Sequence, residues 1–274
     1  MTTIRDMVIT SPLDADGNVA GSVRDPMVEV GRGNVTGQKI VVVPGLHEAN
    51  VSNTFLDDLS LVDPTTGILP DVTLAAGIQM EIVSSHAEDK TDGTGVQSVK
   101  IHYLDDSFDE QTETVVPAGA TPVNTVATDI RRVQWISAQA VGTGCVAAGN
   151  ISLRNTAGSV TYEYIVAGGN QSLSARYTVP NAKTAYLLGW HCSGMKKRVE
   201  FYLRATCDRA TRALIAGVFL FQDFEVCESS NSGELTALRG LKFPAQCSIK
   251  ISVKADAATL AEAGGAFSLL VVDD

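Results

Sequence analysis

Short apolar runs separated by turn-forming residues are the feature that most constrains the fold of this chain. The clearest case is the stretch 159–190, SVTYEYIVAGGNQSLSARYTVPNAKTAYLLGW. Its central run, 173–179, alternates apolar with polar side chains, which is the period of a half-buried strand. Gly168-Gly169-Asn170 precedes that run and Pro180-Asn181 follows it, and both are typical turn sequences. The stretch therefore predicts three strands joined by two tight connections.

The same pattern continues through most of the chain. Helical patterns are confined to 46–60 and to 255–263, and no alternation of strand and helix patterns is present. A dozen short strands with turn signals between them predict an all-β fold, an antiparallel β-sandwich of the jelly-roll or immunoglobulin-like type. The further apolar or alternating runs lie at 39–43, 78–84, 98–104, 112–116, 130–138, 150–154, 198–207, 213–226, 247–254 and 267–272.

The beginning of the chain has a different character. Up to about residue 38 it is rich in Gly, Asp, Asn and Val, and glycines and prolines interrupt every apolar pattern. Such a segment buries too little surface to order itself alone. We assign 1–45 to an extended N-terminal arm and 46–274 to a β-sandwich body, with a division into two sub-domains near residue 125 as an alternative.

The charge is negative and uneven. The whole chain has 21 Lys and Arg against 31 Asp and Glu, and its first 115 residues have 6 against 19. Because phosphate contacts require lysine and arginine, the acidic front half argues against binding nucleic acid through that part. The asymmetry also allows a second interpretation, in which acidic and basic halves of neighbouring copies face each other.

Cysteines and the N-terminal sequence bear on the compartment. The five cysteines form no CxxC pair, and their odd number and wide spacing predict free, mostly buried thiols in a reducing compartment. The first residues contain no continuous apolar segment, and no run approaches the ~20 apolar residues that cross a bilayer. We therefore expect neither a signal peptide nor a membrane partner. The cysteines are Cys145, Cys192, Cys207, Cys227 and Cys247.

Candidate metal and catalytic groups are scattered rather than patterned. The acidic stretches at 14–18, 88–93 and 105–113 do not complete the twelve-residue calcium loop, so solvated turns are favoured over calcium sites. His47, His86, His102 and His191 show no metal-ligand spacing. Cys145, between glycines, is predicted to be a buried small hydrophobe. We predict no catalytic, cofactor-binding or metal-binding residue.

Positive charge gathers in one part of the chain, and aromatic residues are few. The basic run is predicted to be a solvated strand end, with a contact for an acidic neighbour as the alternative. Trp135 and Trp190 lie within apolar runs and are predicted to be core residues. The basic residues are Lys196, Lys197, Arg198, Arg204, Arg209 and Arg212.

Two stretches resemble segments of structural proteins of tailed bacteriophage particles. They are IVSSHAEDKTDGTGVQSVKIHYLDDSFDEQTETV at 82–115 and GNQSLSARYTVPNAKTAYL at 169–187. With the strands between them, the resemblance covers about 74–190, whereas 1–70 resembles nothing familiar. At the turn of the second stretch, Asn181 and Ala182 stand where the phage pattern usually has alanine and glycine. The matching motifs are turns and strand edges.

The resemblance implies a virion component that carries out no chemistry. We expect a non-enzymatic capsid decoration or head-fibre protein that forms a homo-oligomer, a trimer by preference, and binds the major capsid protein or other virion proteins. It would be assembled in the host cytoplasm and would contact neither nucleic acid nor membrane. One alternative is a tail-fibre or spike module that recognises host surface polysaccharide. Another is a hydrolase or lyase on a β scaffold, which would need a cleft with converging carboxylates.

Overall fold

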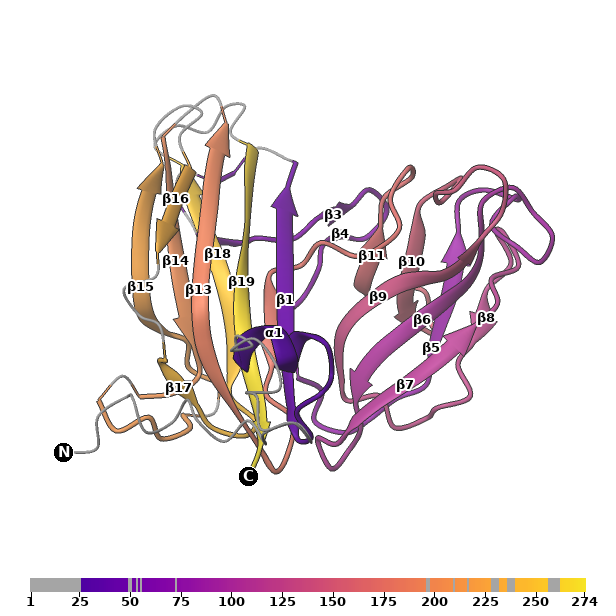
Figure 1. Cartoon of the computed structure of the whole chain (residues 1–274). Coiled ribbons are helices and arrows are strands. Elements are labelled where there is room, and N and C mark those ends of the chain that lie inside the picture. Colours follow the sequence, from indigo (N-terminus) through magenta and orange to yellow (C-terminus); the bar gives the residue numbers. More distant parts are fainter. Residues whose placement is uncertain are drawn as a thin grey trace, which may run out of the picture.

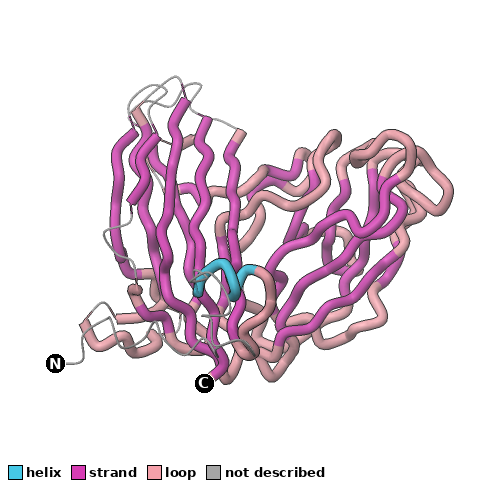
Figure 2. The backbone as a smooth tube through the Cα atoms, in the orientation of Figure 1, coloured by secondary structure: helices cyan, strands magenta, loops and turns pink. Residues whose placement is uncertain are grey.

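The computed structural model describes residues 26–274, apart from 49–50, 53, 55, 72, 196–197, 209, 216, 228–231, 236–239 and 256–261. Strands dominate the described chain (Figure 2). Every pairing between its named strands is antiparallel. The prediction of an all-β, antiparallel fold is confirmed. One short helix, α1 (Pro26–Gly31), precedes the first strand.

The strands form five sheets. Their orders are β1-β19-β13-β16 with β17 on β13, β12-β18-β14-β15 with β2 on β18, β11-β10-β5-β8, β7-β6-β9, and the pair β3-β4. In chain order the strands are β1 (Gln38–His47), β2 (Asp57–Asp58), β3 (Val62–Asp63), β4 (Gly67–Ile68), β5 (Met80–Ser84), β6 (Val96–Leu104), β7 (Glu110–Val115), β8 (Val123–Asn124), β9 (Arg132–Val141), β10 (Ile151–Asn155), β11 (Thr161–Ile165), β12 (Arg176–Thr178), β13 (Lys183–Met195), β14 (Val199–Ala205), β15 (Leu220–Cys227), β16 (Ser232–Leu235), β17 (Lys242–Phe243), β18 (Ser248–Ala255) and β19 (Glu262–Asp273).

These sheets make two lobes, each with its own core (Figure 1). The terminal lobe contains β1, β2 and β12–β19, and its two large sheets face each other across a core that includes Trp190, Phe201 and Phe267. The inserted lobe contains β5–β11, and its core includes Ile101 and Ile136. Both cores form because alternate strand residues point to one face, where burying each apolar side chain contributes about 1.5–3 kcal/mol.

This arrangement differs from the single sandwich expected for 46–274. Ile101 and Ile136 lie on either side of residue 125 but share one core, so the chain does not divide there. The terminal lobe instead combines strands from the beginning and the end of the described chain. The inserted lobe is formed by the part of the sequence between them. The sheets of the terminal lobe do not clearly form a jelly roll, so the predicted sandwich type is not established.

Several local expectations were wrong at their boundaries. Residues 38–45 were assigned to the arm but pair with β19 as part of β1, and residues 1–25 lie outside the described chain. The helix expected within 46–60 is not formed at 57–58, which is β2, while the one expected at 255–263 falls mostly on undescribed residues. The strand expected at 213–226 begins only at Leu220.

The three strands expected within 159–190 are confirmed as β11, β12 and the first part of β13. The turn between β12 and β13 places Ala182 at a φ of 51°. Glycine adopts this left-handed region without strain, whereas alanine does so at some conformational cost.

Close packing around Gly45 gives a stability prediction. A Cβ built at Gly45 on β1 would lie 2.4 Å from the Leu59 carbonyl oxygen and 2.5 Å from the Ala175 Cβ. Gly45→Ala is therefore expected to lower the free energy of unfolding by about 1–3 kcal/mol, because backbone would have to move. Urea denaturation measures the change. Gly31→Ala is the control, since its Cβ would meet only Ile40, at 3.8 Å, and equal losses in the two variants would contradict the prediction.

Candidate functional site

Charged side chains meet at the junction between the two lobes. They come from β9 and β11 of the inserted lobe, from β2, β12 and β18 of the terminal lobe, and from the connecting segment around residue 71. Three are positive and three negative, so their charges balance. We call them the junction cluster: Asp58, Asp71, Arg132, Glu163, Arg176 and Lys250.

The most buried pair of the cluster joins β12 to β11. Arg176 donates from Nε and Nη2 to Glu163 Oε1, at 3.0 and 2.7 Å, and its Nη1 donates to the Pro70 carbonyl at 2.9 Å. The Ser174 hydroxyl donates to the other carboxylate oxygen of Glu163 at 3.0 Å. The two charged side chains are only 4% and 0% exposed. A buried pair satisfied in this way holds the lobes in one relative position, because a shift would leave a buried charge without its partner.

A second chain of ion pairs crosses the same junction. Lys250 on β18 lies 2.9 Å from Asp58 and 3.0 Å from Asp71, and Asp71 lies 2.5 Å from Arg132 on β9. Burial alone would raise the pKa of Asp71, but the positive charges of Arg132, Lys250 and Arg176 outweigh burial and hold that pKa below its usual range. Asp71 is therefore ionised at neutral pH.

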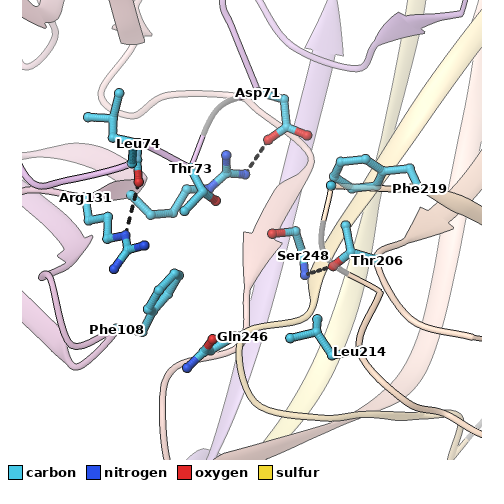
Figure 3. A pocket seen from close by; sticks show the side chains of 13 residues that line it. Asp71, Thr73, Leu74, Phe108, Arg131, Thr206, Leu214, Phe219, Gln246 and Ser248 are labelled. Atoms are coloured by element: carbon cyan, nitrogen blue, oxygen red, sulfur yellow. Dashed lines mark hydrogen bonds and ion pairs between the residues drawn. The ribbon is translucent and has the colours of Figure 1, made fainter.

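A cavity of about 510 Å³ opens beside the Asp71–Arg132 pair (Figure 3). Phe108 and Leu74 from the inserted lobe and Phe219 and Leu214 from the terminal lobe contribute its apolar walls. Asp71 is the carboxylate among its lining residues, and its lowered pKa does not suit a general acid. The cavity thus lacks, among the described residues, the converging carboxylates that the hydrolase alternative requires.

The junction cluster predicts a loss of stability in acid. Because the folded-state pKa of Asp71 is lowered, its contribution is fully present above the unfolded value of about 3.9 and is lost as the pH falls through the folded value. We expect the difference in unfolding free energy between wild type and Asp71→Asn to be largest at neutral pH and to narrow below about pH 4. Urea denaturation at pH 7, 4 and 3 measures it. A difference that stays constant over this range would contradict the assignment.

An exposed group of aromatic side chains lies on the outer face of β14 and β15. Phe221 and Phe224 are 52% and 61% exposed, and the Tyr202 ring lies 5.1 Å from the first and 6.3 Å from the second. Tyr202 pairs directly with Phe224 across the two strands. We call Tyr202, Phe221 and Phe224 the aromatic patch. Contiguous exposed apolar surface of this kind marks an interaction site more often than isolated residues do.

Polar groups flank the aromatic patch along β14. Glu200 accepts a hydrogen bond from the Tyr202 hydroxyl at 2.7 Å, which is the largest cause of a Tyr202 pKa raised to about 12. Two residues further on, the Arg204 guanidinium lies 5.6 Å from the Phe221 ring centre. Its Nη1 is 3.4 Å from Ser252 Oγ, and its buried Nε has no hydrogen-bond partner. The face therefore runs from a carboxylate through an aromatic ring to a guanidinium.

The basic run does not form one surface in the described chain. Arg198 lies 3.7 Å from Glu200, whereas Arg212 turns inward and donates to the Lys242 carbonyl and to Gln222. Residues 196, 197 and 209 lie outside the described chain. Of the described residues of the run, Arg204 lies against the aromatic patch.

The other candidate residues have structural surroundings. His102 stacks on Trp135 with ring centres 4.2 Å apart, and burial is the main cause that lowers its pKa to about 4. Trp190 is a core residue as predicted, and Trp135 packs partly buried against the same core. Cys145 was predicted to be buried but is exposed in a turn with a φ of 62°. Cys145 and the glycines near it lie in a loop, so its side chain is not packed within a strand.

The acidic stretches at 88–93 and 105–113 accept hydrogen bonds from backbone groups, and 14–18 lies outside the described chain. Asp105 accepts hydrogen bonds from the backbone of Ser107 and Asp109. Asp89 is fully buried and accepts from the backbone of Val96 at 2.7 Å, as well as from residues 148 and 149. Among the described residues, no group of three or more His, Cys, Asp or Glu side chains is placed to hold a metal ion. Nor does any helix in that part of the chain have the length and apolar character needed to cross a membrane.

Comparisons of the sequence and the structure with known proteins add little to these observations. No family model matches the chain, and no curated protein does. Among solved structures, two of infectious bursal disease virus, the Gx strain and the VP2 subviral particle, align over 90% of this chain and 78% of theirs, each with 9% identity. Their TM-scores are 0.23 and 0.19, too low to establish a shared fold. No family is shown. The function has to be inferred from the surfaces of the chain itself.

Sequence patterns indicated some of these residues and missed others. The alternation of 198–207 in the sequence places Tyr202 and Arg204 on the face opposite the apolar residues, and the structure confirms this placement. The apolar run 213–226 was predicted as one strand, and its pattern did not indicate that Phe221 and Phe224 are exposed. Gly217, with a φ of 76°, interrupts that run and was the available signal for a turn.

Proposed function

We propose that this protein is a non-enzymatic structural component of a tailed-phage particle, a capsid decoration or head-fibre protein that acts by adhesion. The observation that carries the proposal is the aromatic patch, because it exposes two phenylalanine rings at the open edge of a sheet. The resemblance at 82–115 and 169–187 supplies the class of protein. The buried junction cluster supports it, since a subunit that holds a fixed shape presents its contact surfaces in a fixed geometry.

A second copy of the chain is the partner that best fits the aromatic patch. The rings of Tyr202, Phe221 and Phe224 stand on one face of the sheet, so a second copy would pack against this face. Glu200, Tyr202 and Arg204 follow one another on the same face of β14. A two-fold axis through Tyr202 would place Glu200 opposite the partner subunit's Arg204, and the reverse, so the face is complementary to itself.

This contact modifies the oligomer expected from the resemblance. A two-fold contact makes a dimer, whereas the expected trimer would need a different surface. Another part of the chain must then bind the major capsid protein or other virion proteins. We assign this binding to the N-terminal arm. Because 38–40 belong to β1, the deletion that tests the arm is 1–25, which leaves the sheet complete.

The location of the protein is the test of the proposed function. Particles purified from the virus that encodes this chain should contain it in fixed stoichiometry, as measured by mass spectrometry, and should bind antibodies against it in electron micrographs. A chain that lacks 1–25 should fold but stay in the soluble fraction. Finding the full-length protein only in the soluble fraction of the lysate would overturn the proposal.

The aromatic patch also favours a second candidate, a tail-fibre module that recognises host surface polysaccharide. The Tyr202 and Phe224 rings are inclined by only 25°, so they offer neighbouring flat faces on which sugar rings could stack. A glycan array probed with wild type and with Phe224→Ser separates the two candidates. Binding to a defined polysaccharide that Phe224→Ser abolishes would favour recognition over decoration.

A further inference from the structure

The buried cysteines of the terminal lobe are brought together in pairs. Cys192 lies on β13 and Cys227 ends β15, so the two residues belong to opposite sheets of the lobe. Their sulfur atoms are 3.3 Å apart, and both side chains are buried. The Cys227 thiol lies 3.7 Å from the Cys192 carbonyl oxygen. None of the five cysteines forms a disulfide in this structure.

The positions of these two thiols are close to those of a cross-link. A disulfide has a sulfur–sulfur distance of about 2.05 Å, so the two atoms would have to approach by little more than ~1 Å. Among the described strands, β15 pairs only with β14, and as an edge strand it can shift more easily than a central strand. Residues 35 apart in sequence would be joined, which closes a long loop.

We propose that Cys192 and Cys227 are an oxidative modification site, at which a small peroxide converts the two thiols into a disulfide between the sheets. The Cys227 thiolate attacks one peroxide oxygen, expels hydroxide and becomes a sulfenic acid. The Cys192 thiolate then attacks that sulfur and expels the second hydroxide. The two thiol protons convert both hydroxides into water, and two electrons pass from the sulfurs to the O–O bond. The cross-link would fasten β15, and with it Phe221 and Phe224, to β13.

A second buried pair provides an internal comparison. Cys207 receives a hydrogen bond from Cys247, and the Arg212 Nη2 lies 3.3 Å from its sulfur. The hydrogen bond and, after it, the charge of Arg212 lower the pKa of Cys207 despite burial. Thiolate character would favour reaction at this pair, whereas the 3.3 Å between their sulfur atoms supports reaction at Cys192 and Cys227. Peptide mapping distinguishes the two.

The experiment uses the full-length protein treated with hydrogen peroxide, then alkylated, digested without reduction and mapped by mass spectrometry. We expect a peptide that links Cys192 to Cys227 and a melting temperature raised by roughly 5–10 °C, both reversed by dithiothreitol. Cys145→Ser should show the same gain, which excludes cross-links between molecules. The oxidised and reduced forms of Cys227→Ala should have the same melting temperature, whatever the stability of that variant.

Two results would overturn the inference. One is that Cys192 and Cys227 remain fully open to alkylation in denaturant after peroxide treatment, while the exposed Cys145 is oxidised. The other is a link between Cys207 and Cys247 alone. Neither result bears on the proposed function, because the cross-link depends only on the geometry of the terminal lobe.

Discussion

Arg176→Met is expected to lower the free energy of unfolding by about 3–5 kcal/mol, the typical cost of removing one partner from a buried ion pair. The change leaves Glu163, which is fully buried, with Ser174 as its remaining hydrogen-bond donor across the junction. It also removes donors from the carbonyls of Pro70 and Tyr162. Urea denaturation followed by tryptophan fluorescence measures the loss.

The matched control is an exposed arginine in a similar pair. Arg32 contacts Glu29 at 2.9 Å but is 60% exposed, so Arg32→Met should cost no more than about 1 kcal/mol. The double variant Arg176→Met with Glu163→Leu should recover part of the loss, because it leaves no unpaired buried charge. If Arg176→Met were as mild as Arg32→Met, the junction cluster would not hold the lobes together.

Phe221→Ser combined with Phe224→Ser is expected to weaken self-association at least 30-fold, since an interface aromatic at a hot spot contributes roughly 2 kcal/mol or more. Both rings are more than half exposed, so the stability of the subunit should hardly change. Sedimentation velocity over a range of concentrations gives the dissociation constant, and thermal melting checks the fold.

A matched apolar residue outside the aromatic patch is available as the control. Val42 on β1 is 60% exposed, and Val42→Ser should leave association unchanged. Equal effects of the Val42 and Phe variants would show that general surface hydrophobicity drives association. No effect of the Phe variants would remove the aromatic patch from the interface.

Period-2 alternation predicted which residues of many strands point inward. The alternation of 247–254 in the sequence points Ile249, Ile251 and Val253 inward, and all three are fully buried. The same alternation points Lys250 and Ser252 outward, but both are buried as well. Asp58 of β2 covers that face, and it lies 192 residues away from Lys250 in the sequence. Local pattern cannot reveal a covering element at such a separation.

The aromatic patch and the junction cluster also differ in how far the sequence predicts them. The aromatic patch was partly predictable, because it follows from strand alternation and from one glycine that ends a run. The junction cluster was not, because its six charges come from segments spread between residues 58 and 250. Opposite charges in an acidic chain give no indication of which pairs become buried. Sequence reasoning therefore found the strands but not the contact between the lobes.

The mass of the full-length protein in solution tests most directly the claim that this chain acts by adhesion to its own copies. At micromolar concentration, light scattering should give a dimer or higher multiple of the 28.9 kDa chain. The double Phe variant should move toward the mass of one chain. A wild-type protein that remains a monomer at every concentration measured would contradict the account.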